Sequence, residues 1–132
     1  MAGFNGAHVA LTVTDLTASA AWYKELFDGQ PVFEGNDGVS DVTILALPEN
    51  LLLGLRQHVG TTSGDHFVHD RVGLDHAAFH VDGRNALEDW QNRLDDTGAT
   101  NSGIQESPFG YHLNFKDPDG IALEFFAPKA QA

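Results

Sequence analysis

A short alternating strand pattern followed by a helical pattern occurs near the start of the chain and again past its middle. In the stretch beginning at His8, hydrophobic and polar residues alternate, so His8, Ala10 and Thr12 are predicted to share one face of a strand. Mostly apolar residues then recur at helical spacing, namely Ala18, Ala21, Trp22, Glu25 and Leu26. Asp15 or Thr17 is the candidate N-cap of this helix.

The second occurrence is an internal repeat of the first. A shift of 68 residues places His8 on His76 and Trp22 on Trp90. Leu87, Trp90 and Leu94 follow at helical spacing, and Gly98 is the expected C-cap. Both tryptophans lie on the apolar stripes and are predicted to be core residues.

Three further strand-like segments follow each predicted helix. In the first half they are residues 30–34, 39–47 and 51–58, and in the second half residues 103–106, 112–115 and 121–126. The breakers Pro48-Glu49-Asn50 and Asp117-Pro118-Asp119-Gly120 separate the last two strands of each half. Each half is therefore predicted to be a βαβββ module.

The predicted fold class is α+β, with two tandem βαβββ modules forming a curled mixed sheet with a central cleft. The modules are expected at about 7–58 and 71–128, joined by a connector at 59–70. A module of about 60 residues buries too little surface to be comfortable alone. We therefore expect one domain over residues 1–132.

Composition narrows the possible partners. The chain of 132 residues has a net charge of −12, which disfavours nucleic acids and anionic membranes, since both need a basic surface. It contains no cysteine, which excludes disulfides, thiolate metal sites and a cysteine nucleophile, and fits a cytoplasmic location. No signal peptide or membrane span is expected.

The duplicated modules, the paired His8 and His76 and the closing segment KDPDGIALEFF resemble the vicinal oxygen chelate superfamily. That superfamily includes glyoxalase I, bleomycin-resistance proteins, extradiol dioxygenases, methylmalonyl-CoA epimerase and fosfomycin-resistance transferases. The resemblance covers nearly the whole chain, from about Ala7 to Pro128. Its motifs point to the superfamily rather than to one member.

This resemblance implies a metal site on the first and last strands of each module. His8, His76 and Glu124 occupy three of these positions. The fourth is Gly54 if Pro48 is aligned with Pro118, or Arg56 if the shift of 68 residues is kept, and neither binds a cation. Two imidazoles and one carboxylate can hold one divalent ion, with Fe²⁺, Mn²⁺, Zn²⁺, Ni²⁺ and Co²⁺ as candidates, and leave positions open for substrate.

Other polar residues are in phase with one another or with the ligand positions: His80 with His76, His112 with Asn114, and Arg56 and His58 with Gly54. His80 and His112 are candidate general bases. Arg56, His58 and Asn114 are candidate substrate-binding residues, and Arg56 is suited to a carboxylate or phosphate.

Several departures separate the chain from named subfamilies. Gly54 removes the carboxylate that glyoxalase I would place there. Asn114 stands where extradiol dioxygenases and fosfomycin transferases place a tyrosine. Gln105 replaces an expected histidine of the dioxygenases, while Ile104 and Pro108 replace phosphonate-binding residues of the transferases.

Two hypotheses follow. The first is a divalent-metal-dependent enzyme acting on a small oxygenated substrate that chelates the metal, with lyase, isomerase and ring-cleaving dioxygenase chemistry all open. The alternative is a bleomycin-resistance-like protein that binds or sequesters a small molecule without catalysis. The resemblance also implies a homodimer, in which one site can draw ligands from both subunits.

Overall fold

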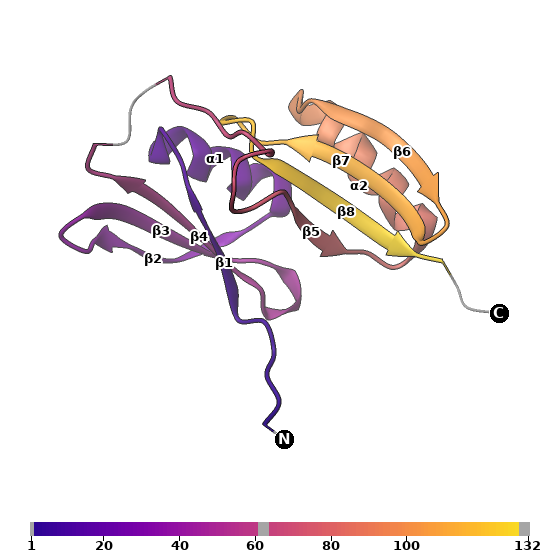
Figure 1. Cartoon of the computed structure of the whole chain (residues 1–132), viewed down its shortest axis with the longest axis horizontal. Coiled ribbons are helices and arrows are strands. Elements are labelled where there is room, and N and C mark those ends of the chain that lie inside the picture. The colour runs from indigo at the N-terminus through magenta and orange to yellow at the C-terminus, as the bar shows by residue number, and fades with distance from the viewer. Residues whose placement is uncertain (1, 61–63, 130–132) are drawn as a thin grey trace. The chain divides into compact units, whose positions relative to one another are not determined.

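The computed structural model describes residues 2–60 and 64–129, and it divides the chain into two compact units, residues 1–65 and 66–132 (Figure 1). The boundary falls inside the predicted connector 59–70, of which residues 61–63 lie outside the described residues. Each unit contains one helix and one four-stranded mixed sheet, which confirms the two βαβββ modules.

The first unit follows the predicted order of elements. Its strands lie in the order β1-β4-β3-β2, with β1 and β4 parallel and the other pairs antiparallel. The short 3-10 turn Pro48–Asn50 occupies the predicted breaker. The elements are β1 (His8–Thr12), α1 (Leu16–Phe27), β2 (Gln30–Asn36), β3 (Ser40–Ala46) and β4 (Leu52–His58).

Helix α1 is capped as the sequence predicts. The Asp15 carboxylate accepts the N–H of Ala18 at 3.1 Å, so Asp15 rather than Thr17 is the N-cap. Gln57 on β4 accepts the N–H of Leu16 through Oε1 at 2.8 Å, which ties the start of the helix to the sheet. The helix ends where Asp28 adopts a left-handed conformation with φ of 54°.

The predicted apolar stripe of α1 is wrong for most of its length, because the buried residues are displaced by about one position from Ala18, Trp22 and Glu25. The residues that are buried on this helix are Ser19, Ala20, Tyr23, Leu26 and Phe27. Trp22 is only half-buried and meets the edge of the Tyr23 ring at 4.8 Å. Because alanines and aromatic residues occupy both faces of the segment, its composition does not single out one apolar stripe.

The second unit repeats this arrangement. Its strands lie in the order β5-β8-β7-β6, with β5 and β8 parallel and the other pairs antiparallel. The elements are β5 (Ala77–His80), α2 (Gly83–Thr97), β6 (Asn101–Ser107), β7 (Gly110–Lys116) and β8 (Ala122–Pro128). His76, predicted on the first strand of this module, directly precedes β5.

The apolar stripe of α2 packs on the core side of this sheet. Leu87 and Leu94 are fully buried, and the half-buried Trp90 stacks on Phe125 of β8 with ring centroids 4.4 Å apart. Gly98 ends the helix with φ of 75°, and its N–H reaches the carbonyl of Asp95 at 3.1 Å, which confirms the predicted C-cap. With Phe125 held on the core side, alternation directs Glu124 to the opposite face of β8.

The turn before β8 is held by one buried carboxylate. Asp117 Oδ1 accepts the N–H of Asp119 at 2.9 Å and the N–H of Ile121 at 2.8 Å. Asp117 itself is buried. These bonds fix the point at which β8 begins, and with it the register that places Glu124.

Strand pairing decides between the two alignments of the repeat. In the first unit Ala10 of β1 pairs with Gly54 of β4, and in the second Ala78 of β5 pairs with Glu124 of β8. Since Ala10 and Ala78 are equivalent in the repeat, the counterpart of Glu124 is Gly54 rather than Arg56.

Candidate functional site

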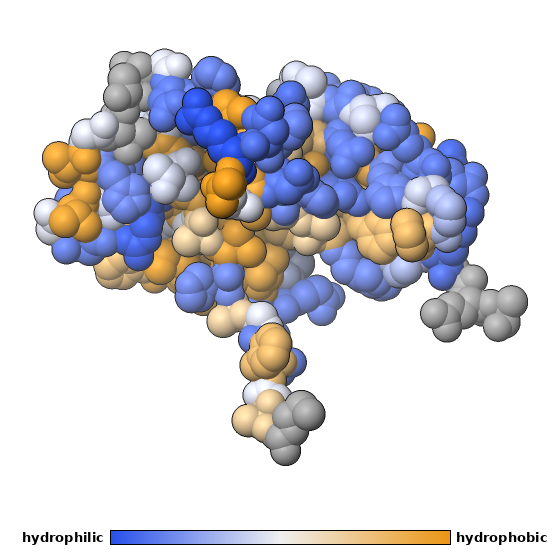
Figure 2. Space-filling view, viewed as in Figure 1, coloured by the Kyte–Doolittle hydropathy of each residue, from blue (hydrophilic) through white to orange (hydrophobic). Residues whose placement is uncertain are grey.

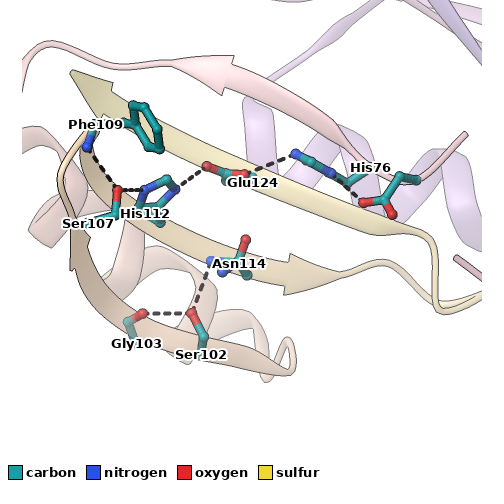
Figure 3. A network of polar contacts seen from close by, with 9 residues as sticks. His76, Ser102, Gly103, Ser107, Phe109, His112, Asn114 and Glu124 are labelled. Carbon is teal, nitrogen blue, oxygen red and sulfur yellow. Dashed lines mark hydrogen bonds and ion pairs between the residues drawn. The ribbon is translucent and has the colours of Figure 1, made fainter.

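Glu124 occupies the centre of β8, between β5 and β7 (Figure 3). Its register partners are Ala78 on β5 and Asn114 on β7. Only 7% of the residue is exposed. A carboxylate this buried needs charged or hydrogen-bonding partners, because its desolvation is costly.

One partner of this carboxylate is His76. His76 Nε2 lies 3.2 Å from Glu124 Oε1, and the other ring nitrogen, Nδ1, lies 2.7 Å from the Asp75 carboxylate (Figure 3). An aspartate behind a histidine in this way fixes the ring orientation of many metal-binding histidines. Asp75 was not among the residues predicted from sequence, although its position directly before His76 is a signal for this role.

The hydrogen-bond donors and acceptors along Asp75, His76 and Glu124 indicate a positive charge between His76 and Glu124. An ionised carboxylate only accepts hydrogen bonds, so Asp75 takes the proton on Nδ1 of His76. In a neutral ring Nε2 is then a bare lone pair facing Glu124 Oε1 at 3.2 Å. Either a second proton or a metal ion has to lie between these two atoms.

The distance between these atoms fits shared coordination. Two ligands at 2.0–2.2 Å from one ion, at right angles, lie about 3 Å apart. The separation and the types of these two atoms are therefore those of a pair that could share one ion, which is part of the group that the resemblance implies. Within the ranges 2–60 and 64–129, however, no three His, Cys, Asp or Glu side chains form a group able to hold a metal ion.

The second partner of Glu124 is His112. His112 Nδ1 lies 2.8 Å from Glu124 Oε2, and His112 Nε2 lies 2.6 Å from the hydroxyl oxygen of Ser107. Sequence analysis missed Ser107. A two-residue hairpin turn could have indicated it. Ser107 pairs with Gly110 across this turn, so Ser107 lies near the start of β7, the strand that carries His112.

Two other predicted residues lie on the same sheet. Asn114 is exposed, and its backbone N–H donates to Ser102 at 3.1 Å. His80 is also exposed, with Nδ1 3.8 Å from Asp82. Both remain candidates for substrate contact or proton transfer.

The remaining candidates lie in the first unit. His8 is exposed on β1, and His58 is half-buried at the end of β4. Arg56 is engaged within its own sheet, since its guanidinium donates to Asp37 and, at 3.1 Å, to Ser40. The predicted assembly of His8 with His76 and Glu124, and the predicted central cleft, stay predictions.

Asp37 is the most electrostatically perturbed carboxylate near these candidates. Backbone N–H groups of Val39 and Ser40, followed by the Ser40 hydroxyl and Arg56, hold the pKa of Asp37 far below its usual range. The loop between β2 and β3 therefore keeps its negative charge, and Arg56 is anchored to it.

A pocket of about 430 Å³ opens beside His76 within the second unit. Its lining includes His69, Asp75, His76, Asn114 and Lys116. The volume suits a small molecule, because small-molecule sites span roughly 300–1,000 Å³. The surface in view over this unit is largely hydrophilic (Figure 2). None of the helices in the described part of the chain is long and apolar enough to cross a membrane.

Comparison with protein families identifies the class. The model of the Glyoxalase/Bleomycin resistance protein/Dioxygenase superfamily matches residues 6–125, and the chain belongs to this superfamily. A glyoxylase/bleomycin resistance protein/dioxygenase domain from Frankia sp. EAN1pec is 37% identical, with a TM-score of 0.91 over 97% of this chain and 100% of that one.

More distant solved structures share the fold. The genomically encoded fosfomycin resistance protein FosX from Listeria monocytogenes is 16% identical, with a TM-score of 0.73 over 98% of this chain and 93% of that one. A point mutant of FosX was crystallised with Mn(II) and 1S,2S-dihydroxypropylphosphonic acid, and matches at 16% identity and a TM-score of 0.72 over 95% and 90% of the two chains. No curated protein matches the chain.

Proposed function

We propose that the protein is a divalent-metal-dependent enzyme acting on a small oxygenated substrate that chelates the metal. The observation that carries the proposal is the contact between His76 Nε2 and Glu124 Oε1 at 3.2 Å, with Asp75 bound to the opposite side of the imidazole. In this arrangement His76 Nε2 and Glu124 Oε1 are adjacent acceptors, and a cation between them would stabilise both.

The proposed ligand set is His8, His76 and Glu124. His8 is the repeat counterpart of His76 and is exposed on β1, so its ring is free of core packing. In a homodimer, which we also propose, His8 can come from either subunit. A divalent ion bound here would act as a Lewis acid that polarises a bound oxygen.

The chain's own residues would bind and orient the substrate. The pocket beside His76 offers the amide of Asn114 and the ammonium of Lys116, which suit an oxygen-rich molecule carrying negative charge. His80 on the same sheet is the proposed proton-transfer group, because its ring is exposed. His112 stays a second candidate for that role, and Arg56 and His58 are proposed to complete the substrate contacts from the first unit.

Two further observations support a metal. FosX, which shares the fold, binds Mn(II) in a crystal structure. Glu124 is also buried in a strand of otherwise apolar residues, where a resident carboxylate is costly without a cation. The absence of cysteine favours a mixed nitrogen and oxygen site, and a cytoplasmic location for the protein.

Metal analysis of the purified full chain tests the proposal. After incubation with Fe²⁺, Mn²⁺, Ni²⁺, Co²⁺ or Zn²⁺ and removal of excess ion, we expect about one equivalent per chain for at least one of them. Glu124→Gln, His76→Ala and His8→Ala should each lose most of the bound metal. His66→Ala, which alters a connector histidine outside the proposed set, is the matched control.

Less than about 0.2 equivalents for every ion would contradict the proposal. It would favour the second candidate, a protein that binds or sequesters a small molecule without catalysis. Retention of metal by His8→Ala alone would instead show that the site is built from the second unit without His8.

A further inference from the structure

A chain of hydrogen bonds runs from the β6–β7 hairpin to the buried carboxylate (Figure 3). The backbone N–H of Phe109 donates to the Ser107 hydroxyl oxygen at 3.2 Å. Ser107 Oγ lies 2.6 Å from His112 Nε2, and His112 Nδ1 lies 2.8 Å from Glu124 Oε2. Three strands, β6, β7 and β8, contribute one side chain each.

The donor and acceptor of each hydrogen bond follow from the two groups at the ends of the series, the Glu124 carboxylate and the Phe109 N–H. An ionised Glu124 only accepts, so His112 Nδ1 must carry the proton that bridges to Oε2. In the neutral ring Nε2 is then an acceptor and takes the hydroxyl proton of Ser107. The lone pair of Ser107 is left to accept the Phe109 N–H, which completes a chain with no conflicting donors.

The consequence for Glu124 is that its two oxygens have different partners. Oε2 is occupied by His112 at 2.8 Å, while Oε1 faces His76 at 3.2 Å. Rotation of the carboxylate would break the bond to His112. The carboxylate plane is therefore fixed with one oxygen presented to the place where a cation would bind.

We propose that Ser107 is a positioning residue, whose hydrogen bond to Nε2 holds the His112 ring in the orientation that directs the Nδ1 proton to Glu124 and thereby fixes that carboxylate. The tautomer part of this proposal depends only on the hydrogen-bond chain. The part that concerns cation binding rests on the proposed function.

The same order of atoms occurs in serine–histidine–carboxylate triads, where the serine is a nucleophile. Two observations favour positioning here. Neither Ser107 nor His112 lines the pocket beside His76. The Ser107 oxygen also accepts a backbone N–H at 3.2 Å, which ties one of its two lone pairs to its own hairpin.

Nuclear magnetic resonance of the metal-free full chain tests the tautomer directly. Long-range proton–nitrogen spectra of the imidazoles should show His112 with its proton on Nδ1. In Ser107→Ala the His112 ring is no longer held at Nε2 and can turn away from Glu124, so a mixture of tautomers is expected. Ser107→Thr, which keeps a hydroxyl, should restore the original form. Thr97→Ala is the matched control: Thr97 also lies in the second unit, on α2, but its hydroxyl donates to the carbonyl of Leu94.

A His112 with its proton on Nε2 in the unaltered chain would overturn the proposal. So would a spectrum that Ser107→Ala leaves unchanged. Both results are independent of metal binding, so they are distinct from a failure of the proposed function.

Cation affinity tests the second part. Ser107→Ala should weaken metal binding about tenfold, in the range seen when groups behind a ligand are removed, while Ser107→Thr and Thr97→Ala leave it unchanged. Equal affinity in Ser107→Ala and the unaltered chain would overturn this part. A fluorophosphonate probe should leave Ser107 unlabelled, and labelling that disappears in His112→Asn would show a nucleophile instead.

Discussion

At the scale of single residues, the proposed metal site depends on side chains that support its proposed ligands. Asp75 lies behind His76, and Ser107 lies behind His112, each within 2.7 Å of its partner. In the sequence analysis, His76 and Glu124 were implied by the resemblance, and His112 was in phase with Asn114 on a recognisable strand. The sequence analysis missed Ser107, because its partnership with His112 depends on how a hairpin closes.

Removal of Asp75 should weaken the proposed metal site. In Asp75→Ala the His76 ring loses the acceptor that holds it, so we expect metal affinity to fall about 10–100-fold. Isothermal titration with the ion that binds best is the measurement. Asp82→Ala, which removes an exposed carboxylate beside His80, is the control and should bind metal normally. Unchanged affinity in Asp75→Ala would contradict the role given to Asp75.

Asp37 should make the stability of the protein depend on pH. Its pKa is lowered by the N–H groups of Val39 and Ser40 in the folded protein, so its stabilising effect is fully present above its unfolded pKa of about 3.9. The effect is lost as pH falls from there towards the lower folded pKa.

Urea unfolding at several pH values measures this effect. The difference in unfolding free energy between the unaltered chain and Asp37→Asn should be constant between about pH 5 and pH 7, and should shrink below about pH 4. Asp41→Asn, one strand position beyond the same loop, is the control. A difference that grows as the pH is lowered would contradict the role of Asp37.

At the scale of elements, the succession of helix and strands in each module was predictable from the repeat, whereas the strand order and the register that pairs Ala10 with Gly54 came from the structure. The breakers at residues 48–50 and 117–120 predicted where the strands that carry Gly54 and Glu124 begin. The inner face of α1 was not predictable, because Ala18, Ala20 and Ala21 are equally apolar. Only packing against the sheet selects Ala20 and Tyr23.

Gly54 is the position where a fourth ligand can be tested. A Cβ there would lie 3.4 Å from Ala10 Cβ, an ordinary contact, so the strand can accept a side chain. If both units contribute to one site, Gly54→Glu should raise metal affinity by at least tenfold over Gly54→Gln, which has the same size without the charge. Equal affinities for the two variants would show that position 54 does not reach the metal.

At the scale of the whole molecule, the two units are joined by the segment between β4 and β5. Asp75 and His76 stand at the end of this segment, and Arg71 within it is exposed. The repeat predicted where this segment lies, since it is what remains between two similar modules. Its link to Glu124 through His76 was implied by the resemblance rather than by the pattern of residues.

Bound metal should protect this segment from trypsin. At a free metal concentration ten times the dissociation constant, cleavage after Arg71 should slow about tenfold if it requires release of His76. Mass spectrometry of the fragments over time is the measurement. His76→Ala should show no protection. Protection of equal size in that variant would contradict the proposed link.

Because His76, a proposed ligand, is the last residue before β5, the conformation of the segment between β4 and β5 and the binding of an ion would be coupled. Coupling of this kind is reciprocal. A conformation of the segment that moves His76 away from Glu124 would weaken ion binding, and a bound ion would disfavour that conformation. A change in the conformation of this segment would then alter how readily the ion is released.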